Sequence, residues 1–224
     1  SSCKDTSTNP VVPSDFGFTK IGSYDSPGTA NDVFVTNINN SNIAFLADGN
    51  SGFHILNVNN NASPTLLSSY NTAGYTYDVK SAKINSTNYA FLADGGNDFV
   101  VMDVSNLSNP VQKYVVEFVD DAIISITIDT VNNKAFAGSF GGFMYIIELN
   151  GLPNSLTVIG TYVAYDKVEG IFVNGGICYL AERDYGLEIV NVSDYTFPVS
   201  ISSANTPGEA FEVTPCDWCA VDVD

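Results

Sequence analysis

The fold is decided by the stretch AFLADGGNDFVVMDV, residues 90–104. Two strand-like apolar runs, Ala90–Ala93 and Phe99–Met102, flank a short segment that contains Asp94-Gly95-Gly96. Apolar runs rich in β-branched and aromatic residues, separated by Asp and Gly, are typical of a β-hairpin. The stretch therefore predicts two antiparallel strands joined by a tight turn.

Weaker copies of this hairpin recur along the chain. Aligning Phe45, Phe91, Phe136 and Tyr179 gives spacings of 46, 45 and 43 residues, and each copy is flanked by two further strand-like runs. A period of this length with four short strands is the signature of a β-propeller blade. No segment shows a sustained helical periodicity. We therefore expect an all-β protein, a β-propeller built from blades of four antiparallel strands.

The last unit is shorter than the others. It continues through Glu209–Thr214 and reaches Trp218–Val223 without a third strand, while Phe18–Tyr24 near the start of the chain matches the outer strand of a blade. We expect five blades, with the ring closed by N-terminal and C-terminal segments that share one blade. The domain division is an extended arm, residues 1–17, followed by a propeller domain, residues 18–224.

One strand of the shared blade remains to be supplied. The arm around Pro10–Ser14 can supply it within the same molecule, although prolines suit only an edge position. Alternatively, a neighbouring molecule donates the strand, which would make the protein the subunit of a polymer.

Two motifs of the units carry a resemblance to a known family. They are Gly186-Leu187-Glu188-Ile189-Val190-Asn191-Val192-Ser193 and the run from Asp103 to Val111, DVSNLSNPV. These motifs resemble the LVIVD-repeat family, whose members are considered β-propellers of microbial surface and secreted proteins. The resemblance implies the same fold and an extracellular or cell-surface location on a microbe, and it supplies no catalytic motif. The third unit departs from the pattern, with Glu148-Leu149-Asn150-Gly151 in place of Asp-Val-Ser.

The charge of the chain restricts its partners. Asp and Glu number 25 against 8 Lys and Arg, which gives a formal net charge of −17. Nucleic acid and anionic membrane surfaces would be repelled by such a molecule. No apolar run reaches the roughly 18 residues of a membrane span. We expect neither nucleic-acid binding nor membrane insertion, and we expect partners among copies of the chain, other surface proteins and glycans.

Four cysteines bear on the cellular compartment. The chain also begins at Ser1 rather than Met, which predicts that a leader has been removed. An even number of cysteines in such a chain favours two disulfides in an oxidising environment. A redox or zinc role for Cys216-Asp217-Trp218-Cys219 is the alternative. The disulfide candidates are Cys3, Cys178, Cys216 and Cys219.

Three carboxylates occupy the same place in the first strand of their units: Asp32, Asp78 and Glu212. The first strand of a propeller blade lines the central channel, so these side chains are expected to converge there. Converging carboxylates form a candidate site for Ca²⁺ or another hard cation. The alternative, which we favour, is that they accept backbone N–H bonds between blades. Ser125 and Gly170 hold this position in the other two units.

Other polar residues are interpreted as surface features. Asp48, Asp94, Asp98, Glu182 and Asp184 are expected in solvated hairpin turns, and the single histidine, His54, on a solvent-facing strand position. With one histidine and no G-x-S-x-G motif, no nucleophile with its base is recognised, so an enzyme is not expected. Asn-x-Ser/Thr sequons make five asparagines glycosylation candidates: Asn39, Asn61, Asn85, Asn106 and Asn191.

These observations favour a non-enzymatic extracellular propeller with a structural or interaction role. The sharper hypothesis is a subunit of a surface fibre or layer, joined through the N-terminal arm or the incomplete last blade. The alternative is a propeller that binds cations or glycans, or hydrolyses glycans, with acidic residues at the channel mouth.

Overall fold

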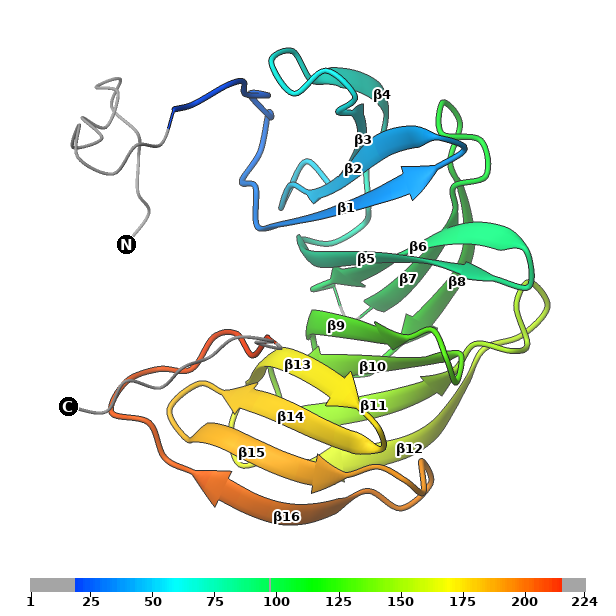
Figure 1. Cartoon of the computed structure of the whole chain (residues 1–224). Coiled ribbons are helices and arrows are strands. Elements are labelled where there is room, and N and C mark those ends of the chain that lie inside the picture. The colour runs from blue at the N-terminus through cyan, green and yellow to red at the C-terminus, as the bar shows by residue number, and fades with distance from the viewer. Residues whose placement is uncertain (1–18, 97, 215–224) are drawn as a thin grey trace.

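Sixteen strands form four antiparallel sheets of four strands each in the computed structural model, which describes residues 19–96 and 98–214 (Figure 1). The first sheet contains β1 (Asp32–Ile38), β2 (Ser41–Ala47), β3 (Phe53–Asn57) and β4 (Thr65–Tyr70). The second contains β5 (Thr76–Ile84), β6 (Thr87–Asp94), β7 (Asp98–Asp103) and β8 (Val111–Glu117). The third contains β9 (Ile123–Asp129), β10 (Lys134–Ser139), β11 (Phe143–Glu148) and β12 (Thr157–Val163). The fourth contains β13 (Val168–Asn174), β14 (Ile177–Glu182), β15 (Gly186–Asn191) and β16 (Val199–Ala204).

Each sheet is a meander in which every strand pairs with the next one along the chain. The four sheets follow one another around an arc, and their first strands β1, β5, β9 and β13 lie side by side on its inner side (Figure 1). The described residues contain no helix, and hence none long and apolar enough to cross a membrane. The predicted all-β architecture of repeated four-stranded units is thus confirmed.

The hairpins between the first and second strands contain residues with positive φ. Asn39 and Asn40 have φ of 51° and 63°, and Asn85 and Ser86 have φ of 48° and 71°. Two consecutive residues with positive φ form the type I′ turn, whose twist matches that of a β-hairpin, and asparagine tolerates this conformation. Local turn chemistry therefore sets the register of these two strand pairs.

The core lies between successive sheets, in three clusters of apolar side chains. Phe45, Phe91 and Phe136 occupy equivalent positions on β2, β6 and β10, and each is fully buried against the sheet that follows. Tyr179 holds this position on β14 but is only partly buried. The difference arises because no fifth sheet follows the fourth among the described residues.

The prediction of five blades differs from the four sheets observed. The residues described before β1 and after β16 form no further paired strands, so neither the fifth sheet nor the closure of the ring is present in residues 19–96 and 98–214. The predicted arm, residues 1–17, and the Trp218–Val223 segment lie outside the described residues.

Candidate functional site

Residues of the inner strands line a cavity of about 360 Å³. The three carboxylates predicted to converge, Asp32, Asp78 and Glu212, all line this cavity. Lys80, Glu169, Tyr77 and Phe211 complete most of its wall. The cavity is thus bounded by β1, β5, β9, β13 and the segment after β16, and it carries more acidic than basic groups.

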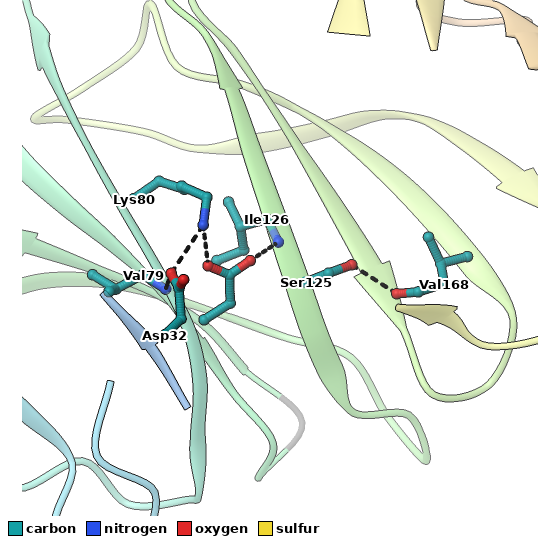
Figure 2. Close-up of polar contacts among 7 residues, drawn as sticks. Asp32, Val79, Lys80, Ser125, Ile126 and Val168 are labelled. Atoms are coloured by element: carbon teal, nitrogen blue, oxygen red, sulfur yellow. Dashed lines mark hydrogen bonds and ion pairs between the residues drawn. The ribbon is translucent and has the colours of Figure 1, made fainter. Parts of the chain in front are cut away.

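Two of these carboxylates connect neighbouring sheets, as Figure 2 shows. Asp32 on β1 accepts a hydrogen bond from Val79 N at 3.2 Å, and Asp78 on β5 accepts one from Ile126 N at 2.7 Å. In the next sheet the equivalent Ser125 donates to Val168 O at 2.7 Å. The favoured interpretation of Asp32 and Asp78 as hydrogen-bond acceptors between blades is confirmed.

Gly170 holds the same position in the fourth sheet, where the absence of a side chain leaves room for the neighbouring backbone. A Cβ at Gly170 would lie 2.9 Å from Glu212 Cα and 3.0 Å from Phe211 O. Glycine therefore allows the backbone of residues 211–212 to approach β13 closely.

An ammonium group lies between the two inner carboxylates. Lys80 Nζ is 3.0 Å from Asp32 Oδ2 and also contacts Asp78 Oδ1 (Figure 2). The sequence analysis missed Lys80, although a signal was present: it lies two residues after Asp78 on the same strand, and alternation places both on one face. Among the described residues, no three acidic, histidine or cysteine side chains are grouped to hold a metal ion. Ca²⁺ binding by Asp32, Asp78 and Glu212 stays a prediction.

Asp32, Asp78 and Lys80 shift one another's pKa values. Burial raises the pKa of Asp78 to about 7, with Asp32 adding to the rise and Lys80 opposing it. For Asp32 burial acts in the same direction, but the hydrogen bond with Asp78 and the charge of Lys80 outweigh it and lower its pKa. Burial lowers the pKa of Lys80, yet the two carboxylates outweigh it and raise that pKa overall. Lys80 therefore offsets the charge of Asp32, and the raised pKa of Asp78 opposes a second negative charge near neutral pH, which weakens the attraction of this group for a metal ion.

The hairpin acids are mostly not in solvated turns, which corrects the sequence interpretation. Asp48, Asp94 and Glu182 are all 0% exposed. Each accepts a hydrogen bond from the loop that leads into its own sheet. The donors are Gly28 N at 2.8 Å, Gly74 N at 2.9 Å and Tyr165 N at 3.0 Å, respectively. These carboxylates fasten the loop to the hairpin, and a buried acceptor needs such donors. Asp184 is exposed as predicted.

His54 was also wrongly predicted to face solvent. It is 4% exposed, and its Nε2 lies 3.1 Å from Asp48 Oδ2. Residues before β1 approach this region, where Ser26 Oγ and Gly28 N both bond Asp48. Strand alternation alone does not reveal such a cover.

A second polar pair occupies the equivalent positions of the fourth sheet. Glu182 and Glu188 are both 0% exposed. Glu188 Oε1 accepts hydrogen bonds from Tyr162 Oη at 2.6 Å and Ser200 Oγ at 2.7 Å. The sequence analysis missed Glu188. Its alternation with Val190, on the same face of β15, was the available signal.

The described part of the disulfide prediction concerns Cys178. Among the described residues it pairs with no other cysteine. It is buried, its Sγ lies 3.4 Å from Met144 Sδ, and burial raises the pKa of its thiol. Cys3, Cys216 and Cys219 lie outside the described residues, so the disulfide pairing stays a prediction.

All five sequon asparagines are exposed: Asn39, Asn61, Asn85, Asn106 and Asn191. Their amides are not equally available. Asn85 Nδ2 donates to Asn150 O at 3.1 Å and Leu152 O at 2.8 Å. By contrast, Asn106 and Asn191 use Oδ1 to accept from a backbone N–H two residues later. Glycosylation stays a prediction, and Asn106 and Asn191 are the better placed of these three.

One solved structure agrees with this architecture. A crystal structure of a protein from Lactobacillus plantarum superposes with a TM-score of 0.64 at 14% identity, and the match covers 75% of this chain and 55% of that chain. The chain therefore spans little more than half the length of that protein, and the likeness concerns the fold alone. No curated protein matches the sequence.

A family model, the LVIVD repeat, matches residues 27–72, 73–117 and 166–206. These three matches contain the first, second and fourth sheets, and the unmatched stretch contains the third, whose sequence departs most from the repeat. Together the matches cover more than half of the chain. The chain belongs to the LVIVD repeat family.

Proposed function

We propose that the chain is a non-enzymatic propeller of the extracellular space or of a microbial surface, with a structural or interaction role. Its ring has five blades, and the fifth is completed by a strand from a neighbouring molecule, which links subunits into a fibre or layer. The observation that carries the proposal is the uncovered apolar face of the fourth sheet.

Within residues 19–96 and 98–214, that face lacks the cover that its equivalents have. Phe172, Tyr179 and Ile189 are direct neighbours across β13, β14 and β15, and all three are partly exposed. Their equivalents in the first sheet include Phe45 and Ile55, both 0% exposed. Burying partly exposed apolar side chains contributes roughly 25 cal/mol per Å², so a fifth blade on this face would stabilise the ring.

The segment after β16 supports the inner strand of such a blade. Ala210 N donates to Arg183 O at 2.7 Å, and Gly170 allows residues 211–212 to lie close to β13. Phe211 and Glu212 line the cavity together with residues of β1, β5 and β13. Residues 210–212 thus lie next to β13, just as the first strand of each observed sheet lies next to the first strand of the sheet before it.

The segment before β1 supports the outer strand. A Cβ at Gly22 would collide with Asn61 O, and a Cβ at Gly160, on the outer strand β12, would collide with Tyr195 O of the next sheet. Asn61 and Tyr195 lie in equivalent loops after the third strands of their sheets. Residues 21–24 therefore lie against the first sheet in the same way that the outer strand β12 lies against the fourth sheet.

We propose that the missing third strand is residues 1–17 of a neighbouring molecule. An added strand gains main-chain hydrogen bonds along an open edge. Deleting residues 1–17 should abolish polymers seen by light scattering while the far-ultraviolet circular dichroism of the ring persists. Polymers formed by the truncated chain, or a strictly monomeric wild type, would contradict the proposal.

A point variant tests the uncovered face separately. Tyr179→Lys places a charge where the fifth blade packs. The protein concentration needed to form polymers should therefore rise more than tenfold. Tyr165→Lys is the matched control, because Tyr165 is 64% exposed in the loop before β13. Equal assembly by the two variants would argue against the fourth sheet as the joining face.

The second candidate function is binding of cations or glycans at the channel mouth. The cavity of about 360 Å³ favours it, because carboxylates and the partly exposed rings of Tyr77 and Phe211 face the same space. Aromatic faces beside carboxylates suit organic cations and sugars. Titration calorimetry with Ca²⁺, an alkylamine and simple glycans should give heat that Asp32→Asn with Asp78→Asn removes and Asp184→Asn retains. Absence of heat with the wild type would exclude these ligands.

A further inference from the structure

The acidic pair Glu182 and Glu188 lies at the seam between the third and fourth sheets. Tyr162, which bonds Glu188, belongs to the third sheet, and Tyr165, whose N–H bonds Glu182, lies in the loop that links the two sheets. We propose that Glu182 and Glu188 share one proton and form a pH-sensitive latch, which holds this seam closed and loosens it when the proton is lost.

Unpartnered oxygens indicate the shared proton. Glu182 Oε2 and Glu188 Oε1 have donors, but Glu182 Oε1 and Glu188 Oε2 are buried without a hydrogen-bond partner. Two ionised carboxylates offer only acceptors, whereas a protonated carboxyl also donates. A single proton that Glu182 holds and donates to Glu188 gives both oxygens a partner and removes the like-charge repulsion.

The neighbouring groups supply no compensating cation. Tyr162 faces the pair from β12 and Ser200 from β16, and both act as neutral donors. Asp166, in the loop before β13, accepts from Lys167 N and Asp184 N.

Two basic side chains of the neighbouring segments are engaged elsewhere. Arg183 bonds Glu169 and Glu209, and Lys167 Nζ lies 3.6 Å from the centre of the Phe140 ring. No described lysine, arginine or histidine forms an ion pair with either member of the acidic pair.

The pKa of Glu182 agrees with this geometry. Burial, followed by the hydrogen bond and the charge of Glu188, raises it from 4.5 to about 8. Above that pH two negative charges lie side by side in a site closed to water. Because their donors come from both sides of the seam, separating the sheets is the way to hydrate them.

The test compares Glu182→Gln with the wild type. Glutamine keeps an oxygen for Tyr165 N and adds an N–H that donates to Glu188, so it imitates the protonated state. The melting temperature of the wild type should fall as the pH rises from 6 to 9. The protection factors of amides in β12 and β14, which correct for the base-catalysed rise in intrinsic exchange, should fall at least tenfold. Glu182→Gln should lose most of both changes, whereas Asp184→Asn, an exposed acid of the same hairpin, should keep them.

Infrared spectra of the wild type give a second measurement, which does not depend on folding of the variant. A protonated carboxyl absorbs apart from carboxylates. Because Asp78 also holds a proton near pH 7, the band of Glu182 is the part that persists at pH 8 and fades by pH 9. No such band at pH 8, or equal pH dependence in Glu182→Gln, would overturn the latch. A Ca²⁺-dependent rise in melting temperature that Glu182→Gln abolishes would replace the proton with a bound cation and also overturn it.

Discussion

The first and fourth sheets place different chemistry on the same frame. Asp48 directly follows β2 and Glu182 ends β14, in equivalent places of the repeat. His54 and Glu188 follow on the neighbouring strands. In the first sheet the two side chains attract, with Asp48 Oδ2 3.1 Å from His54 Nε2. In the fourth sheet they are two acids. The repeat thus specifies strands and turns, while the residues at these two positions are free to vary.

The carboxylate of the first sheet has the larger structural role. Asp48 accepts from Ser26 Oγ at 2.6 Å and Gly28 N at 2.8 Å, besides its contact with His54. Asp48→Ala should lower the free energy of unfolding by about 3 kcal/mol, because buried donors lose their acceptor. Urea denaturation measures the loss, and Asp184→Ala, at an exposed acid, should change it by no more than about 0.5 kcal/mol. A comparable loss in both variants would show that burial of Asp48 is not what matters.

The second experiment gives the fourth sheet an acid–histidine pair like that of the first sheet. A group whose pKa is raised on folding, from 4.5 to about 8 for Glu182, keeps a proton that the unfolded chain has released between these values. Stability therefore falls as the pH rises through this window, by about 1.4 kcal/mol per unit, and is constant above it.

Glu188→His removes the second acid and offers Glu182 a donor. Glu182 alone should cost the wild type about 2–3 kcal/mol between pH 6 and pH 9, in addition to the loss that comes from Asp78, whose pKa is also raised. The variant should keep only the part due to Asp78, so its loss should be smaller by about 2 kcal/mol. Urea denaturation at several pH values measures both losses. If the variant retains the full loss, another group is responsible for it.

The sequence was sufficient for features that repeat. The spacing of Phe45, Phe91 and Phe136 gave the four-stranded unit, because a position that packs on the next sheet must be apolar in every copy. The hydrogen bonds that Asp32 and Asp78 accept from the next sheet were predicted as well, since both residues recur at one place in the unit.

Features that depend on contacts between distant segments were missed or wrongly predicted. His54 is buried where residues 26–28 approach Asp48, and Lys80 lies between carboxylates of two different sheets. Neither contact follows from alternation along a single strand. The hairpin acids were misinterpreted for the same reason, because Asp-Gly suits a solvated turn and a buried carboxylate that fastens a loop equally well.

The smallest expected effect distinguishes the third sheet from the fourth. Tyr145 and Tyr162 each donate a hydroxyl hydrogen bond to a carboxylate, Asp121 at 3.0 Å and Glu188 at 2.6 Å. Asp121 also accepts from Gly141 N and Ala122 N, both at 2.8 Å. Without Tyr162, Glu188 keeps one hydroxyl donor, Ser200, besides the proton of Glu182, whereas Asp121 keeps two backbone donors without Tyr145. The carboxylate of Glu188 therefore depends more on its tyrosine.

Tyr162→Phe should therefore cost about 1.5 kcal/mol and Tyr145→Phe about 0.5 kcal/mol at pH 6. Urea denaturation of both variants beside the wild type provides the comparison, and neither change removes an aromatic ring from the core. At pH 9 the cost of Tyr162→Phe should grow, because the hydroxyl then donates to one of two ionised acids that nothing else neutralises. A cost that stays constant with pH would mean that Glu182 releases its proton outside this range, and the contrast between the two seams would reduce to a difference in hydrogen-bond number.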